Sequence, residues 1–409
     1  MKLEKNRYDY MLILLCWVLA AGNIGAFFQP VRVLIILLIP FFVIDSIQHK
    51  IPVGHTLHTP PSYKYEVLTF IIWGVYSVIS LYWVLDLESS IKACFHLLIN
   101  FFGFGELLWL ASKAQKPHKA LFIGWALMFL TTVPIALNEF INDQHLSMSL
   151  HDSDMTMKMG KNTLEERRFA SVTFGNLNAY NVILCMTFCI MLIQSLREKR
   201  IERLISYGMV VCLIAMIAEN SSRASLICIA TALVMYALVL LKKRSHIIIL
   251  LGGVAIIFGL YIYRFAELFS MILTRFQVQG LEDVGRMSVI VYGLEEFHQS
   301  YGLGIGIGNF IPTMLTKYHL DIAAPHNLLL EVGVQFGVIV LALFIGIFIR
   351  IFKRAKAGTI FNRSAALLGI IPFIPASIID SGYIAKVPTW FYIATIYILS
   401  MPEYNDSEI

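Results

Sequence analysis

Charged side chains are scarce in this chain. Asp, Glu, Lys and Arg make up 14% of its 409 residues, whereas soluble proteins carry about 25%. Hydrophobic residues make up 58%, and the mean hydropathy is +0.72. This composition excludes a water-soluble globular domain. We therefore predict an all-α, polytopic integral membrane protein, because helices satisfy their own backbone hydrogen bonds in lipid.

Cysteines are also missing from the polar loops. All six cysteines fall within apolar segments, which argues against a disulfide framework. Neither a C-x-x-C nor an H-x-x-E-H pattern occurs, so we expect no catalytic metal and no other cofactor. The basic runs lack interleaved aromatic residues, and therefore no nucleic-acid partner is expected.

Long apolar stretches, in contrast, recur along the whole chain. A membrane-spanning helix needs about 20 mostly apolar residues. The first stretch, at 10–28, lacks a small-residue cleavage site, so we expect a span there and no cleavable signal peptide. The length rule predicts about twelve spans, at residues 8–28, 31–48, 64–85, 91–112, 119–140, 179–196, 204–219, 224–241, 246–263, 327–352, 364–381 and 388–402.

The positive charges predict how these spans are oriented. Most of the 32 Lys and Arg residues fall in short connections on one side, such as KAQKPHK at 113–119 and REKRIER at 197–203. Cytoplasmic loops carry such an excess, so both chain ends are predicted to lie inside. Two longer polar loops, at 140–178 and 264–326, are then expected outside. We see no internal repeat and treat residues 1–409 as a single polytopic domain.

The positive-inside rule does not explain two arginines on the predicted outer side. Arg223 begins a span after a short turn, at the depth of the membrane interface. Arg286 heads an amphipathic helix whose apolar residues recur at helical spacing from Met287 to Phe297. A guanidinium presents a planar fork of donors that suits phosphate oxygens. The alternatives are snorkelling or a pair with Glu219 for Arg223, and an ordinary solvated side chain for Arg286.

His326 lies just before a long apolar span, in the run AAPHNLLLE. Pro325 disfavours helix at the residue before it, so the helix is predicted to begin near His326 or Asn327. The positive end of a helix dipole disfavours imidazolium, and a neutral imidazole is what a general base requires. The alternative is a capping or packing histidine.

A glycine-rich run and a few ionisable residues in apolar segments complete the candidates. The run YGLGIGIGNF at 301–310 lacks the strand–turn–helix context of a dinucleotide site, so we expect close backbone approach or a flexible lid. Ionisable groups at membrane depth are costly and often functional. Asp380, at the outer end of a span, is positioned to pair with an outer arginine. His96 and Glu106 lie within the fourth predicted span; for all three, simple pairing between helices is the alternative.

Taken in order, these patterns resemble the O-antigen ligase and polymerase superfamily. They are S-R-A at 222–224, G-R at 285–286 opening a helix, G-x-G-x-G-N-F at 304–310 and H-N-x-x-L-E-x-G at 326–333. The segment RFASVTFGNLN at 168–178 is similar to the R-x-x-G-x-x-x-N-x-N patch that precedes them in the family. The resemblance covers about residues 165–345, and the first 160 residues match only in hydropathy.

The resemblance implies a metal-independent, inverting glycosyltransferase of the GT-C type. It would take a glycan from undecaprenyl diphosphate in a bacterial inner membrane, with its active site in the second large loop and facing the periplasm. The residues implied are His326 as the catalytic base, Arg223, Arg286 and Arg275 as groups that bind the diphosphate, and Asp380, Asn327, Glu331, Arg168 and Asn178 in support.

Members of this superfamily differ in their acceptor. A ligase transfers the glycan to the lipid A-core of lipopolysaccharide, whereas a polymerase transfers it to another lipid-linked repeat. Protein O-oligosaccharyltransferases share the same motifs. Chain length and the S-I-I-D-S-G run around Asp380 favour the ligase. A transporter of lipid-linked glycans, which would place charges inside a bundle of matched halves, is the alternative from another class.

Overall fold

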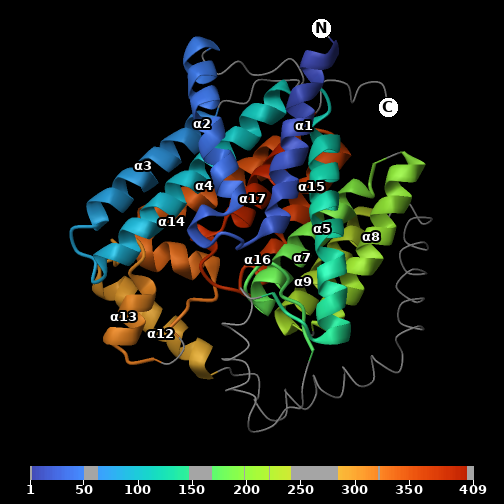
Figure 1. Cartoon of the computed structure of the whole chain (residues 1–409). Helices are drawn as coiled ribbons and strands as arrows, with labels where there is room; N and C mark the ends of the chain where they lie inside the picture. The colour runs from blue at the N-terminus through green and yellow to red at the C-terminus, as the bar shows by residue number, and fades with distance from the viewer. Residues whose placement is uncertain are drawn as a thin grey trace.

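The computed structural model describes residues 2–49, 63–146, 168–197, 199–220, 222–240, 284–320 and 323–402. Every regular element in these ranges is a helix (Figure 1), which confirms the predicted all-α class for the described part. Seven helices are long and apolar enough to cross a membrane. They are α2 (Pro30–His49), α4 (Leu87–Lys113), α5 (Pro117–Asn142), α7 (Leu177–Gln194), α8 (Arg200–Glu219), α9 (Arg223–Leu240) and α14 (Leu328–Ala357).

Shorter helices complete the bundle. They are α1 (Lys2–Val18), α3 (Lys64–Ser80), α15 (Ile360–Ile370), α16 (Phe373–Ala376) and α17 (Val387–Leu399). Each predicted span among the described residues overlaps at least one helix, whereas the span at 246–263 lies outside the described residues. The count of twelve therefore stays a prediction.

Two predicted spans are interrupted in the structure. The stretch 364–381 does not form one helix, because Pro372 ends α15 and only the single turn of α16 follows. The stretch 8–28 leaves the α-helix after Val18 and continues as two 3-10 turns, η1 (Leu19–Ala21) and η2 (Ala26–Phe28). Hydropathy locates apolar sequence, but it does not detect where a helix ends within that sequence.

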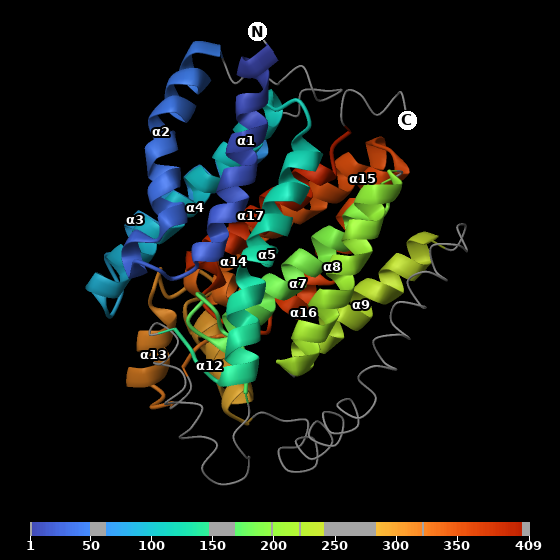
Figure 2. The ribbon, with the colours of Figure 1, turned by 45° about the vertical axis from the view of Figure 1, so that its right-hand side comes forward.

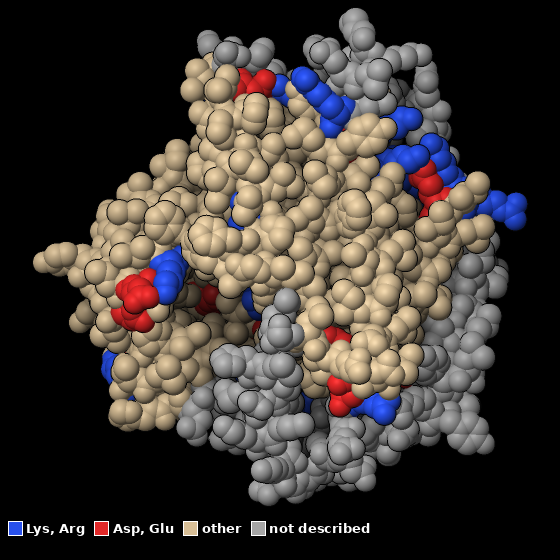
Figure 3. Space-filling view, viewed as in Figure 1, with Lys and Arg blue, Asp and Glu red and all other residues tan. Residues whose placement is uncertain are grey.

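At one end of the bundle, hydrogen bonds connect neighbouring helices. The Asp9 carboxylate, in the first half of α1, accepts from the backbone of Gln115 and Lys116 at 3.3 and 3.0 Å. His118, in the first turn of α5, lies 3.1 Å from the carbonyl of Ile398 at the end of α17. Figure 3 shows Lys and Arg along the upper edge, where Figure 1 places the start of α1. We call this end, with residues 113–119 and 353–363, the basic face; that it faces the cytoplasm stays a prediction.

The opposite end is built from the longer connections. The Asn23 side chain, after α1, donates to the carbonyl of Phe174 at 2.8 Å, and the backbone of Leu85, after α3, donates to Asn309 Oδ1 at 2.8 Å. We call this end the loop face; its segments are residues 19–29, 81–86, 168–176, 300–320, 323–327 and 377–386. Figures 1 and 2 both place α12 and α13 at this end, away from the N-terminus.

Two helices run through the middle of the bundle. α7 and α17 are buried along almost their whole length. The indole of Trp390 in α17 contacts the rings of Phe101 and Trp73, with centroid separations of 5.1 and 5.6 Å. Close packing of this kind, more than the hydrophobic effect, holds helices together in lipid.

α12 (Val284–Gln299) and α13 (Phe310–Thr316) form a lobe on the loop face. The lobe packs on the first part of α14 through a small core of its own. That core consists of Val289, Ile305, Phe310, Met314, Ala323 and Val334. Because α12 contributes Val289 and α14 contributes Val334, the core sets how α12 lies against the start of α14.

The glycine-rich run joins the lobe to a break in α14. Gly337 has φ 76° and ψ −178°, which interrupts that helix. The run occupies the break: Gly306 donates to the carbonyl of Gln335 at 3.0 Å, and Val338 donates to that of Gly302 at 2.8 Å. Close backbone approach, one of the two roles expected for this run, is confirmed.

We expect Gly337→Ala to destabilise the protein by about 1–3 kcal/mol. An added Cβ would clash with the carbonyl oxygen of Leu303, and the left-handed backbone at this position strains any side chain. Thermal unfolding of the purified protein in detergent should show a lower Tm. Gly208→Ala in α8 is the control, because a Cβ there meets nothing within 4 Å, and it should leave the Tm equal or raise it. A wild-type Tm for Gly337→Ala would contradict the role of this break.

Candidate active site at the start of α14

His326 lies in the turn that leads into α14. The side chain of Asn327 accepts from the backbone of Leu330 at 3.0 Å and caps the helix, which begins at Leu328. His326 itself has φ 39°, which is uncommon for a residue other than glycine. The backbone of Leu328 donates to the carbonyl of Ser377 at 3.1 Å. The turn is therefore docked against the segment 377–386.

The imidazole of His326 is half-buried, and its pKa is lowered. Burial is the largest cause, and the positive charge of Arg286 is the second. Lys386 lowers the pKa further, whereas Asp380 and the backbone of Ile379 oppose the shift. Nδ1 is buried without a hydrogen-bond partner in the described part of the chain. The ring is neutral at neutral pH, in the direction predicted from the helix dipole, but burial and a neighbouring arginine are the main causes.

The charge of Arg286, which lies on another element, acts on this imidazole. Arg286 is the third residue of α12 and is half-buried. Its effect on the pKa of His326 means that the two motifs, far apart in the chain, lie close together. The packing of Val289 in α12 with Val334 in α14 accounts for this proximity.

The apolar residues of α12 do not all face the protein. Met287, Val291 and Leu294 are 50%, 53% and 54% exposed. On the opposite side of the helix, Glu296 is buried and accepts the hydroxyl of Tyr318 at 2.6 Å. The exposed apolar stripe suits a helix that lies along a lipid surface.

Asp380 and Lys386 lie together on the segment between α16 and α17. The ammonium of Lys386 contacts Oδ2 of Asp380, whose side chain is 4% exposed, against 36% for the lysine. The partner expected for Asp380 was an arginine, and the structure shows this lysine instead. Sequence reasoning missed Lys386, although it is a positive charge on the predicted outer side, where topology requires none.

Glu331 and Tyr383 hold this segment against α14. Glu331, in the first turn of α14, accepts the backbone N–H of Tyr383 at 3.0 Å and is 4% exposed. The Tyr383 hydroxyl accepts the backbone N–H of Asp380 at 2.9 Å and donates to the carbonyl of Ala376 at 2.8 Å. Glu331 therefore positions the segment that carries Asp380 and Lys386.

Arg32 holds the same segment from α2, and sequence reasoning missed it. It is 6% exposed and donates from Nη2 to the carbonyl of Ala385 at 3.0 Å. Its Nη1 lies 3.0 Å from Nε2 of His96 in α4. These contacts fix the short turn η4 (Tyr383–Ala385) directly before Lys386.

Arg223 is the first residue of α9 and is half-buried. It lies on the loop face, because Asn220 in the turn before it accepts the backbone N–H of Ala170 at 2.8 Å. α9 packs against α16, which leads into the segment 377–386 (Figure 2). That Arg223 shares a ligand with Arg286 stays a prediction, and Arg275 lies outside the described residues.

Arg168 and Asn178 belong to the segment that leads into α7. Arg168 donates to the carbonyls of Phe140, at 3.4 Å, and Ile141. These carbonyls lie at the C-terminal end of α5, where a cation offsets the helix dipole. Asn178 is half-buried in the first turn of α7, for which Asn176 is the N-cap. Arg168 thus caps a helix, and the supporting role of both residues in the site stays a prediction.

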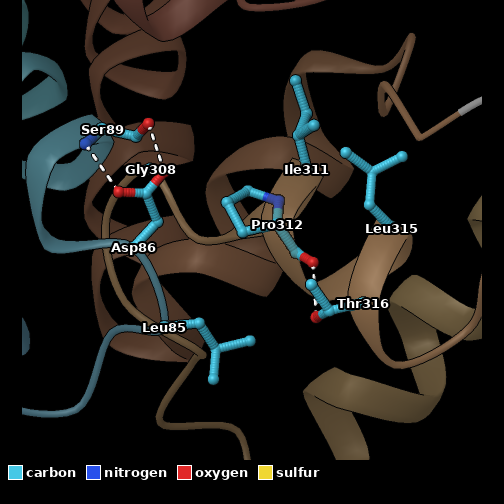
Figure 4. Close-up of a pocket in the computed structure, with 8 residues that line it drawn as sticks. All are labelled: Leu85, Asp86, Ser89, Gly308, Ile311, Pro312, Leu315 and Thr316. Carbon is cyan, nitrogen blue, oxygen red and sulfur yellow. Dashed lines mark hydrogen bonds between the residues drawn. The ribbon is translucent and has the colours of Figure 1, made fainter.

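A pocket of about 510 Å³ opens on the loop face between α4 and α13 (Figure 4). Its polar groups bond one another: Asp86 accepts the Ser89 hydroxyl at 2.6 Å, and the Thr316 hydroxyl donates to Pro312 at 2.7 Å. No predicted site residue that the structure describes lines this pocket, so it is separate from His326. Within the described ranges, no group of three His, Cys, Asp or Glu side chains converges as a metal site.

The helices and the site define a multi-pass membrane protein with a half-buried imidazole and cations on one face. Residues 208–345 match the family model of the O-antigen ligase. The chain is also similar to the teichuronic acid biosynthesis protein TuaE of Bacillus subtilis (strain 168), with 24% identity over 299 residues. The match covers 69% of this chain and 59% of the length of that relative. The resemblance to the O-antigen ligase and polymerase superfamily is thereby confirmed.

Glu331→Ala should destabilise the protein by about 1–3 kcal/mol, because the buried N–H of Tyr383 loses its acceptor. Glu331→Gln keeps an acceptor oxygen of the same shape and should retain most of the stability. The measurement is the Tm of each purified variant in detergent. Equal Tm values for Glu331→Ala and the wild type would show that this hydrogen bond does not hold the segment.

Proposed function

We propose that this chain is a glycosyltransferase that moves a glycan from undecaprenyl diphosphate to an acceptor hydroxyl at the loop face. The observation that carries the proposal is the half-buried, neutral imidazole of His326 with the charge of Arg286 acting on it. The reaction needs a base and an anion-binding group close together. The family match over residues 208–345 supports this class of reaction.

The chemical step forms one bond and breaks another. The acceptor oxygen attacks the anomeric carbon of the glycan, while the bond from that carbon to a diphosphate oxygen breaks. His326 takes the proton of the acceptor hydroxyl, and the lipid diphosphate leaves with the electron pair. Attack on the side opposite the leaving group inverts the anomeric centre. The base requires a lone pair on a ring nitrogen, which the neutral imidazole supplies.

Arg286 has two effects in this scheme. Its guanidinium binds phosphate oxygens and stabilises the charge that grows on the leaving diphosphate. The same charge adds to the effect of burial and lowers the pKa of His326. Arg223 and Arg275 complete the diphosphate site, as the family resemblance implies. With the basic face toward the cytoplasm, transfer takes place at the periplasmic side of a bacterial inner membrane.

The acceptor decides between a ligase and a polymerase. Sequence analysis favours the lipid A-core as acceptor, whereas the similar TuaE is named for teichuronic acid biosynthesis. That name supports a second candidate, a polymerase that extends a lipid-linked glycan.

Reconstitution with rival acceptors tests the function and separates the two candidates. Purified protein receives an undecaprenyl-diphosphate glycan, no added metal, and either the lipid A-core or further lipid-linked repeats. Glycan on the lipid A-core identifies a ligase, and lipid-linked glycans of increasing length identify a polymerase. Absence of product with both acceptors contradicts the proposal.

His326→Ala should lower the transfer rate by roughly 10²–10⁴, as expected for a lost general base, while donor binding changes little. In the wild type, the rate should hold through neutral pH and fall only below pH 6.5, because the pKa of His326 lies below that value. The measurement is the initial rate of transfer of a labelled glycan against pH. His298→Ala, which alters an exposed histidine of α12, is the control and should match the wild type. Full transfer by His326→Ala ends the assignment, and partial glycan movement without transfer favours a transporter.

Arg286→Lys should raise the KM for the donor, because lysine lacks the guanidinium fork. Its charge remains, so the fall in rate at low pH should stay in place. Arg286→Gln should also move that fall to higher pH, because the pKa of His326 rises when the neighbouring cation is removed. Arg223→Lys should likewise raise the donor KM, and Arg363→Lys on the basic face is the control. An unchanged donor KM in Arg286→Lys would mean that the arginine does not bind the diphosphate.

A further inference from the structure

Lys386 is a cation on the loop face outside the range that matches the family model. Its ammonium contacts Asp380, which is its hydrogen-bond partner within the described part of the chain. An ammonium carries three donors, so two remain for a ligand. The side chain is 36% exposed, which allows a ligand to approach.

The backbone that carries Lys386 is held on several sides. Arg32 from α2 bonds the carbonyl of Ala385 at 3.0 Å, and Asn100 from α4 bonds the carbonyl of Ile384 at 2.8 Å. An ion pair within one exposed loop would not need buried side chains from two helices to hold its backbone. The arrangement presents the lysine at a defined place, and Asp380 holds its ammonium.

The charge of Lys386 acts on the same imidazole as that of Arg286. Both cations lower the pKa of His326, and the carboxylate of Asp380 opposes them. The three charged groups therefore lie near one ring, because the segment 377–386 is docked on the start of α14 through the bonds of Leu328 to Ser377 and of Tyr383 to Glu331. The donor in the proposed function carries a diphosphate, and an ammonium near Arg286 adds N–H donors for its oxygens.

We infer that Lys386 is a further donor-binding residue of this site. Asp380 holds the ammonium beside His326, and the two remaining N–H donors bind oxygens of the lipid diphosphate. The inference rests on the proposed function and specifies how the donor is held. The competing explanation is a purely structural ion pair, which would contribute to folding and leave donor affinity unchanged.

A double-mutant cycle separates the two explanations. The variants are Lys386→Gln, Asp380→Asn and the two combined, and the measurements are the affinity for undecaprenyl diphosphate in nanodiscs and the Tm. Lys386→Gln should weaken binding by about 10- to 100-fold, as expected for a lost charge-assisted hydrogen bond. It should also lower the Tm, because it leaves the buried carboxylate of Asp380 unpaired. Asp380→Asn alone keeps the ammonium and an amide oxygen that accepts from it, so it should bind close to the wild-type affinity.

The combined variant gives the deciding result. It removes both charges, so the Tm should recover while binding of the diphosphate stays weak. Recovery of binding together with the Tm would overturn the inference and leave Lys386 as half of a structural ion pair. Lys92→Gln is the matched control, because Lys92 forms an exposed ion pair with Glu88 at 2.6 Å at the loop-face end of α4; its affinity should equal that of the wild type.

The same assay distinguishes failure of the inference from failure of the proposed function. If the wild type binds undecaprenyl diphosphate, Arg286→Gln does not, and Lys386→Gln binds like the wild type, the inference fails and the function stands. If the wild type binds no more than empty nanodiscs do, the proposed function fails, and the inference fails with it.

Discussion

A peptide group that leaves a helix at membrane depth has no water to bond with, so it needs a partner in the protein. The loop face meets this constraint in several places, where a buried carboxylate or a backbone carbonyl accepts such an N–H group. The buried carboxylate of Glu139 accepts the N–H groups of Ser171 and Val172 at 2.7 and 2.9 Å. Glu331 does the same for the segment 377–386, and the glycine run supplies backbone partners at the break in α14. The positions of the candidate site residues follow from these contacts.

This constraint also explains the electrostatics of the site. Loops that are tied to buried side chains lie partly within the bundle, and a histidine on such a loop is half removed from water. Charges interact more strongly where water is excluded. Burial and the charge of Arg286 therefore act in the same direction on His326. The same neighbourhood brings Asp380 and Lys386 close enough to shift the pKa of the ring.

Sequence analysis located the helices well because hydropathy is a local property of the chain. The predicted ranges for α2, α4 and α5 differ from the observed helices by only a few residues at each end. The motifs also identified His326 and Arg286, which the structure brings together. The method failed where a helix stops inside an apolar stretch, as at Pro372. It also failed for Arg32 and Lys386, which belong to none of the motifs.

The sequence by itself determined that the chain is helical, lies in a membrane and carries an imidazole and guanidinium groups at the ends of apolar segments. Composition, spacing and charge asymmetry are sufficient for those conclusions. Only the tertiary structure decided that a lysine pairs with Asp380, that the glycine run enters α14 at Gly337, and that burial keeps His326 neutral. Each of these depends on which distant segments pack together, and packing depends on the shapes of all the surrounding side chains at once.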